Sequence, residues 1–211
     1  MFFDLPPVQP STEIVITSDY VRDGLSLTDG KGAVQGAVRL DAGAVYVRAA
    51  GTLAKFDNAY GADAEVRLTA GVEREVAGFN VNASATYTNY RGAIVGVDND
   101  EMDYRVDVSR DFGKVNAAVA FQYNPDTFVG GGEEKLVDTR VSFPVGLGAE
   151  LSGGAGRVWA DQGDYTIWNV GVTKNITETV ALDVRYYDNT ADNRVGVSYG
   201  DRIALSLRTS F

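Results

Sequence analysis

The feature of this sequence that most constrains its fold is an alternation of apolar and polar residues along almost the whole chain. In residues 63–75, for example, Val66 and Leu68 alternate with the charged residues Glu65 and Arg67. A period of two places successive side chains on opposite faces of a β-strand. The sequence therefore predicts an all-β fold.

Twelve segments follow this period: 13–23, 33–41, 44–54, 63–75, 78–91, 101–112, 114–124, 133–143, 148–159, 164–174, 179–189 and 194–211. The connections alternate between short turns, most of which contain Gly or Pro, and longer loops. Short turns at one end and longer loops at the other are typical of an antiparallel up-and-down meander. We therefore expect a closed barrel of about 12 strands over residues 13–211, preceded by an N-terminal extension at 1–12.

Composition excludes several functional classes. The 211 residues include no Cys and no His, so disulfides, thiolate metal sites and His-dependent catalysis are absent. The formal net charge of −10 argues against nucleic acid as a partner. The longest run without a charged residue, 76–90, is too short and too polar for a membrane-spanning helix. We expect no enzyme activity, no cofactor and no catalytic or metal-ligating residues.

Two kinds of barrel share this pattern. A soluble barrel turns its apolar face inward, whereas a transmembrane barrel turns that face to lipid. The apolar face here is aliphatic in the middle of the strands and aromatic at both ends. The phenylalanines at the short-turn end are Phe79, Phe112, Phe143 and Phe211. The tyrosines toward the long-loop end are Tyr20, Tyr87, Tyr104, Tyr123, Tyr186 and Tyr199. Two aromatic belts around an aliphatic band favour the transmembrane barrel over the soluble one.

In a transmembrane barrel, the polar faces line the lumen. The charged candidates for this lining are Arg39, Arg48, Glu65, Arg67, Asp103, Arg105, Asp107, Asp138, Arg140, Asp183, Arg185, Arg202 and Arg208. One hypothesis is a narrow, monomeric porin-like channel for passive diffusion of small polar solutes or ions. The alternative is a barrel plugged by internal Arg–carboxylate pairs, which serves as a scaffold, adhesin or partner-binding surface.

A resemblance to a known family rests on the beginning of the chain. Residues 17–21 (Thr-Ser-Asp-Tyr-Val), 24–30 (Gly-Leu-Ser-Leu-Thr-Asp-Gly) and 33–36 (Ala-Val-Gln-Gly) resemble the opening signature of the TorF-like family of outer-membrane porins. That family typically reads T-S-D-Y-V-F-R-G, then S-Q-T-D, then P-A-x-Q-G. This sequence departs from the pattern after Val21, at Leu27 where Gln is usual, and at Gly32 where Pro is usual.

The resemblance implies a porin in the bacterial outer membrane of a Gram-negative cell, with both termini in the periplasm. Lipid and lipopolysaccharide would surround the barrel, and small polar solutes would pass through it. A terminal aromatic residue, here Phe211, resembles the assembly signal that the barrel-assembly machinery reads in such proteins.

Acidic residues concentrate in the longer loops, which account for the whole net charge. The simpler interpretation is that exposed loops are acidic for solubility. The alternative is a rim that attracts cations or bridges lipopolysaccharide through divalent ions.

Three further motifs are candidates for separate sites. Asp19 and Asp29 are candidates for a functional role, although strand pairing near Asp19 and a turn at 28–30 explain them more simply. Residues 98–101 (Asp-Asn-Asp-Glu) are acidic but lack the spacing of a calcium loop. Residues 30–36 approach a G-x-G-x-x-G motif but precede a predicted strand, so a dinucleotide site is not expected.

Overall fold

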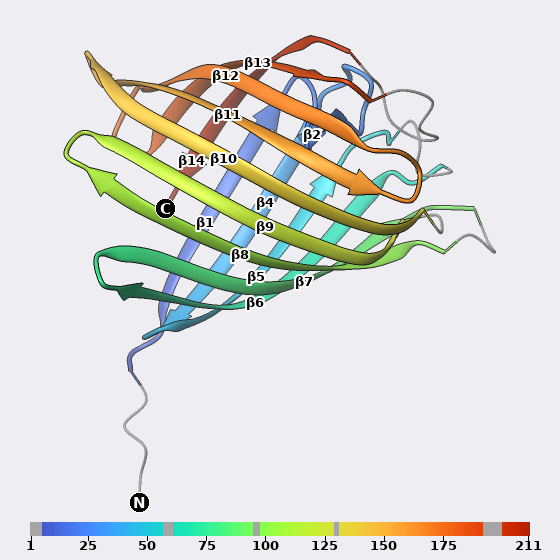
Figure 1. Ribbon diagram of the computed structural model, residues 1–211, viewed down its shortest axis with the longest axis horizontal. Coiled ribbons are helices and arrows are strands. Elements are labelled where there is room, and N and C mark those ends of the chain that lie inside the picture. The colour runs from blue at the N-terminus through green and yellow to red at the C-terminus, as the bar shows by residue number, and fades with distance from the viewer. Residues whose placement is uncertain (1–5, 57–60, 95–97, 129–130, 192–199) are drawn as a thin grey trace, which may run out of the picture.

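The computed structural model describes residues 6–56, 61–94, 98–128, 131–191 and 200–211. Within these ranges, twelve antiparallel strands close into one barrel, in which each strand lies beside its neighbours along the chain and β1 lies beside β14 (Figure 1). The barrel strands are β1 (Gln9–Thr17), β4 (Ala33–Ala42), β5 (Val45–Leu53), β6 (Ala64–Val76), β7 (Phe79–Arg91), β8 (Asp100–Phe112), β9 (Val115–Thr127), β10 (Gly132–Gly146), β11 (Ala149–Ala160), β12 (Tyr165–Asn175), β13 (Val180–Asn189) and β14 (Arg202–Ser210). The predicted all-β, closed up-and-down barrel is confirmed.

Two further strands of two residues each, β2 (Val21–Arg22) and β3 (Leu25–Ser26), pair only with each other. Among the described residues, no helix is long and apolar enough to cross a membrane.

Closure of the sheet depends on the two ends of the chain. β1 pairs with β4 along its full length and with β14 from Glu13 to Thr17. The last residue, Phe211, extends this seam, because its backbone N–H and C=O both bond to Thr12 at 3.0 Å. Every described barrel strand therefore has two partners, and the barrel sheet has no open edge strand. Both described ends of the chain lie at the end of the barrel that carries the short turns.

The two faces of the wall differ sharply in chemistry. Leu68 and Val106 point outward and are 52% and 43% exposed, whereas Glu65 and Asp103 point inward and are 1% and 8% exposed. The same alternation runs through the neighbouring strands, so the outside of the barrel is apolar and the inside is polar. A soluble barrel with an apolar interior is therefore not the arrangement that this chain adopts.

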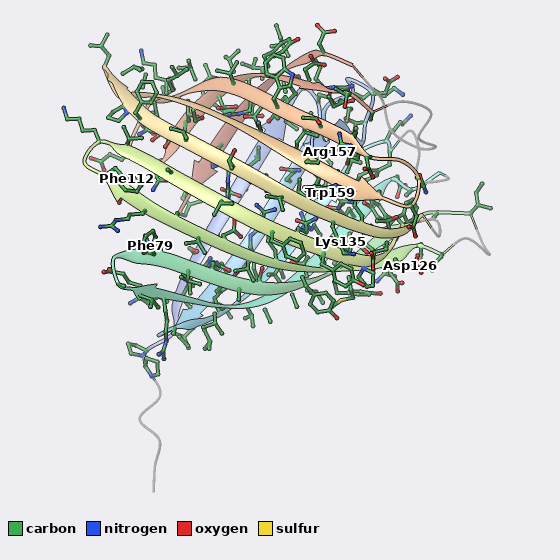
Figure 2. The ribbon with its side chains drawn as sticks, in the orientation of Figure 1. Phe79, Phe112, Asp126, Lys135, Arg157 and Trp159 are labelled. Atoms are coloured by element: carbon green, nitrogen blue, oxygen red, sulfur yellow. The ribbon has the colours of Figure 1, made fainter. Side chains whose placement is uncertain are left out.

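Aromatic residues lie at both ends of the apolar exterior. The phenylalanine belt at the short-turn end is confirmed: Phe79, Phe112, Phe143 and Phe211 are all exposed, and Figure 2 shows the first two at that end. Tyr87 and Tyr104 are exposed toward the long-loop end, together with Trp159 and Trp168, which the tyrosine pattern had not included.

The predicted position of Tyr20 in the outer belt is wrong. The first strand was expected at about 13–23, but β1 ends at Thr17, and Tyr20 is only 9% exposed inside the barrel. The chain leaves the wall after Ser18, which still pairs with Leu205 through its backbone N–H at 2.9 Å. Tyr199 and the other residues of 192–199, part of the predicted last strand, lie outside the described residues.

Candidate functional site

The segment from Ser18 to Gly32, called here the inward hairpin, lies inside the barrel rather than in its wall. It contains β2 and β3, and Leu25, Ser26 and Thr28 are at most 5% exposed. A turn joins the two strands, with positive φ at Asp23 (48°) and Gly24 (78°). The hairpin follows β1 and precedes β4, which places it at the long-loop end of the lumen (Figure 1).

Asp19 organises the base of the inward hairpin. Its Oδ1 accepts hydrogen bonds from Ser26 Oγ at 2.5 Å and from Thr28 Oγ1 at 2.9 Å. Its Oδ2 forms an ion pair with Arg202 Nη1 of β14 at 3.2 Å. The Thr28 hydroxyl also accepts from the backbone N–H of Tyr20 at 3.0 Å. Asp19 therefore ties both arms of the hairpin to the wall, a role beyond the simple strand pairing expected for this position.

A charged cluster fixes the hairpin to one side of the barrel. Arg22 Nη1 contacts Glu65 Oε2 of β6 at 2.9 Å, and Arg22 Nη2 contacts Glu101 Oε1 of β8 at 2.7 Å. The Arg22 Nη2 group also donates to Tyr90 of β7, and the Tyr20 hydroxyl donates to Glu65 Oε1 at 3.0 Å. The two carboxylates are 1% and 5% exposed, and both contact the same guanidinium where water is scarce.

Protonation in this cluster follows from its surroundings. Burial and the nearby Glu65 carboxylate raise the pKa of Tyr20, so its hydroxyl remains a hydrogen-bond donor at neutral pH. Burial lowers the pKa of Arg22, but Tyr90, Glu101 and Glu65 raise it by more, so the guanidinium stays charged. The Arg22 guanidinium is therefore a fixed positive charge at the centre of the cluster.

The tip of the hairpin reaches the opposite side of the barrel. The Gly24 carbonyl accepts from Asn189 Nδ2 of β13 at 3.0 Å. Leu25 packs in an apolar cluster with Leu136 of β10, Val158 of β11 and Ile167 of β12. Together with the Arg22 contacts, these interactions hold the hairpin across the lumen. The hairpin therefore narrows the lumen at the long-loop end.

Below the hairpin, the predicted lumen residues form networks of ion pairs. Arg105 contacts Asp138 at 2.7 Å and Asp107 at 3.0 Å. Arg140 contacts the same two carboxylates, at 2.5 Å for Asp107 and 3.5 Å for Asp138. The structure thus brings two arginines and two aspartates from β8 and β10 into one neutral group on the inner wall.

The other predicted residues are distributed around the lumen. Arg185 pairs with Asp183 at 3.0 Å, and Arg39 pairs with Asp41 at 2.7 Å. Arg48 and Arg208 share Glu13, at 3.6 and 3.3 Å.

Two of the predicted lumen residues, Arg67 and Asp103, form no ion pair within the part of the chain that the structure describes. Asp103 accepts from Gln122 at 3.2 Å and from Asn124 at 3.1 Å. Arg67 Nε has no hydrogen-bond partner. The sequence analysis did not identify Arg22, Glu13 and Glu101 as ion-pair partners, and Arg22 stands where the chain departs from the TorF-like signature.

Polar cavities remain in the lumen beside the hairpin. One of about 340 Å³ is bounded by Asp19, Glu150, Arg185 and Arg208 and extends toward the short-turn end. Another of about 420 Å³ is lined by the Arg105–Asp138 group. Within the described residues, no group of three or more acidic side chains is arranged to hold a metal ion. The site is thus a polar interior with charged walls and cavities of a few hundred Å³, which suits passage or retention of small hydrophilic species.

Comparison with known proteins places the chain in a family. The model of the Gcw_chp family, which is described as a bacterial protein of unknown function, matches residues 5–210. The chain therefore belongs to this family. No curated protein matches its sequence. The narrower resemblance to TorF-like porins stays a prediction.

Solved outer-membrane proteins share the fold. A KdgM porin in complex with disordered oligogalacturonate matches with a TM-score of 0.67 at 7% identity, over 95% of this chain and 99% of that chain. The NanC porin matches with a TM-score of 0.62 at 9% identity, over 95% and 98%. The COG4313 outer membrane channel from Pseudomonas putida F1 matches with a TM-score of 0.57 at 14% identity, over 97% and 95%. At these identities the likeness establishes the fold alone.

Substitution of two glycines tests whether the tip of the hairpin packs against the barrel wall. Gly24 and Gly30 both have positive φ, 78° and 73°, but a Cβ on Gly24 would overlap Ile167 of the wall, whereas a Cβ on Gly30 would meet nothing within 4 Å. Gly30→Ala should cost only the backbone strain of about 1–2 kcal/mol. Gly24→Ala should add about 1–3 kcal/mol of overpacking and loosen the hairpin. Limited trypsin digestion at Arg22 measures how firmly the hairpin is held. Equal protection of the two variants would contradict the close packing of Gly24 against Ile167.

Proposed function

We propose that this Gcw_chp protein is a channel of the Gram-negative outer membrane, through which small polar solutes or ions diffuse passively. The observation that carries the proposal is the division of chemistry between the two faces of the wall. Exposed aliphatic side chains such as Leu68 and Val106 suit contact with hydrocarbon. A closed ladder satisfies the backbone there, and the charged interior suits water.

The dimensions of the lumen limit what passes. The inward hairpin crosses the lumen, and two polar cavities beside it measure about 340 and 420 Å³. These volumes suit small solutes and ions rather than large oligomers. The oligogalacturonate bound by the KdgM porin is therefore not proposed as a solute of this chain.

Several related expectations belong to this proposal. Both termini would lie in the periplasm, and the acidic loops would face outward toward lipopolysaccharide. Phe211, which is 72% exposed at the barrel seam, is available as the assembly signal for the barrel-assembly machinery. We expect the barrel to function as a monomer, since each described barrel strand already has two partners within the chain.

One observation favours a second candidate function. The hairpin is tied to β6 and β8 through Arg22 and to β13 through Gly24, so it bridges opposite walls. A hairpin held in this way suits a plugged barrel that acts as a scaffold, an adhesin or a partner-binding surface.

Single-channel recording separates the two candidates. The purified protein, inserted into a planar bilayer, should give discrete conductance steps, and liposomes that contain it should swell in small sugars and amino acids. Silence in both assays, with insertion verified by protease protection, would favour the plugged barrel.

Arg105→Ala tests whether the lumen group faces the permeating ions. Asp107 and Asp138 keep Arg140 as a partner, so the barrel should fold normally but carry one more unbalanced negative charge. We expect a shift of reversal potential toward cation selectivity. Arg157→Ala is the matched control, because Arg157 lies on the outer face (Figure 2). An unchanged reversal potential for Arg105→Ala would place this residue outside the conduction path.

Val106→Arg tests contact with lipid. A charge near the middle of the lipid face should reduce the free energy of unfolding by about 2–4 kcal/mol, whereas one near the interface should cost about 0–1 kcal/mol. Val76→Arg is the depth control, because exposed Val76 ends β6 beside a short turn. Denaturant titration in lipid vesicles measures both, and equal stabilities for the two variants would argue against burial of Val106 in hydrocarbon.

A further inference from the structure

The carboxylate of Asp23, at the turn of the inward hairpin, is not neutralised by an ion pair within the part of the chain that the structure describes. It accepts a hydrogen bond from Gln122 Nε2 of β9 at 3.3 Å. Asp23 also lines the cavity of about 420 Å³ that the hairpin shares with β8 and with β10 to β13. The hairpin therefore presents a negative charge to this cavity.

A guanidinium with unused donors lines the same cavity. The side chain of Arg140 on β10 is 54% exposed, although it points into the barrel. Its one hydrogen bond to the described residues runs from Nη2 to Asp107 Oδ1, and its Nε lies 3.5 Å from Asp138 Oδ1. The Nη1 group of Arg140 is therefore available as a donor to a solute in the cavity.

We propose that this cavity binds a small zwitterion with one ammonium and one carboxylate group, as in an amino acid. The Asp23 carboxylate accepts from the ammonium, and Arg140 donates to the carboxylate. Both contacts are charge-assisted hydrogen bonds, which are stronger than neutral ones. The inference names a solute class for the proposed channel, and it rests on that proposed function for the claim that such solutes cross the barrel.

The balance of charges around the cavity favours a zwitterion over a simple ion. Its lining contains the carboxylates of Asp23 and Asp138 and the guanidiniums of Arg105 and Arg140. A simple cation that approaches Asp23 is repelled by the two guanidiniums, and a simple anion that approaches Arg140 is repelled by the two carboxylates. A solute that carries both charges is attracted at both positions.

The size and the remaining walls of the cavity fit a small amino acid. A volume of about 420 Å³ lies in the range of small-molecule sites. The buried side chains of Leu136 and Ile167 form an apolar part of the lining, beside the polar groups of Asn169 and Tyr187. A short apolar side chain therefore has a place to pack next to the charged groups.

Three ligands that differ only in their charged groups test the site. They are L-alanine, propionate, which lacks the ammonium, and ethylammonium, which lacks the carboxylate. Titrations of the full chain in detergent micelles, followed by saturation-transfer NMR of the ligand methyl group, measure each Kd. Alanine should bind about tenfold more tightly than either analogue, since it makes one more charge-assisted contact. Asp23→Asn should remove the advantage of alanine over propionate, and Arg140→Gln should remove its advantage over ethylammonium.

Both substitutions should preserve the fold. Asn tolerates the positive φ of Asp23 (48°) and keeps an oxygen acceptor for Gln122. Arg140→Gln leaves the two aspartates of the inner-wall group paired with Arg105. The heat-dependent gel shift of β-barrels checks folding. Arg157→Gln, an equal loss of charge on the outer face (Figure 2), is the matched control and should bind alanine as the wild type does.

Planar-bilayer recording of the same samples separates the two proposals. Conductance without tighter binding of alanine would overturn the zwitterion site and leave the channel standing. Tight binding of alanine by a silent barrel would support the site but overturn passage through it. If alanine binds equally to the wild type, Asp23→Asn and Arg140→Gln, the assignment to this cavity is wrong.

Discussion

Closure of the backbone ladder is the constraint on which the rest of this structure depends. Because β1 pairs with β14, and Phe211 continues that pairing to Thr12, each described barrel strand is hydrogen-bonded to a neighbour on both sides. Aliphatic residues can then occupy the exterior without leaving polar backbone exposed beside them. A polar interior follows, since successive side chains in each strand must point to opposite faces.

The inward hairpin converts this polar interior from a wide tube into a set of small charged cavities. Its anchors differ from wall to wall: buried ion pairs at Arg22, an apolar cluster at Leu25 and a shared carboxylate at Asp19. Buried ion pairs add little stability by themselves, but removing one partner is costly. Such anchors therefore specify one position of the hairpin more effectively than they stabilise the barrel.

The sequence allowed prediction of the barrel and of which side chains face inward. One shift of register would have reversed both faces, so the alternation in segments such as 63–75 was strongly informative. It misplaced Tyr20, because the hairpin continues the same alternation after leaving the wall. It also could not identify partners such as Arg105 and Asp138, which lie on β8 and β10 and meet only through the register of β9.

The central claim, that the apolar face contacts hydrocarbon, is tested most directly by the fluorescence of the chain's two tryptophans. Trp159 and Trp168 both point outward and are 45% and 40% exposed. In bilayers of brominated phospholipid their emission should be strongly quenched, whereas aqueous iodide should have little effect. Strong quenching by iodide together with insensitivity to brominated lipid would contradict the account.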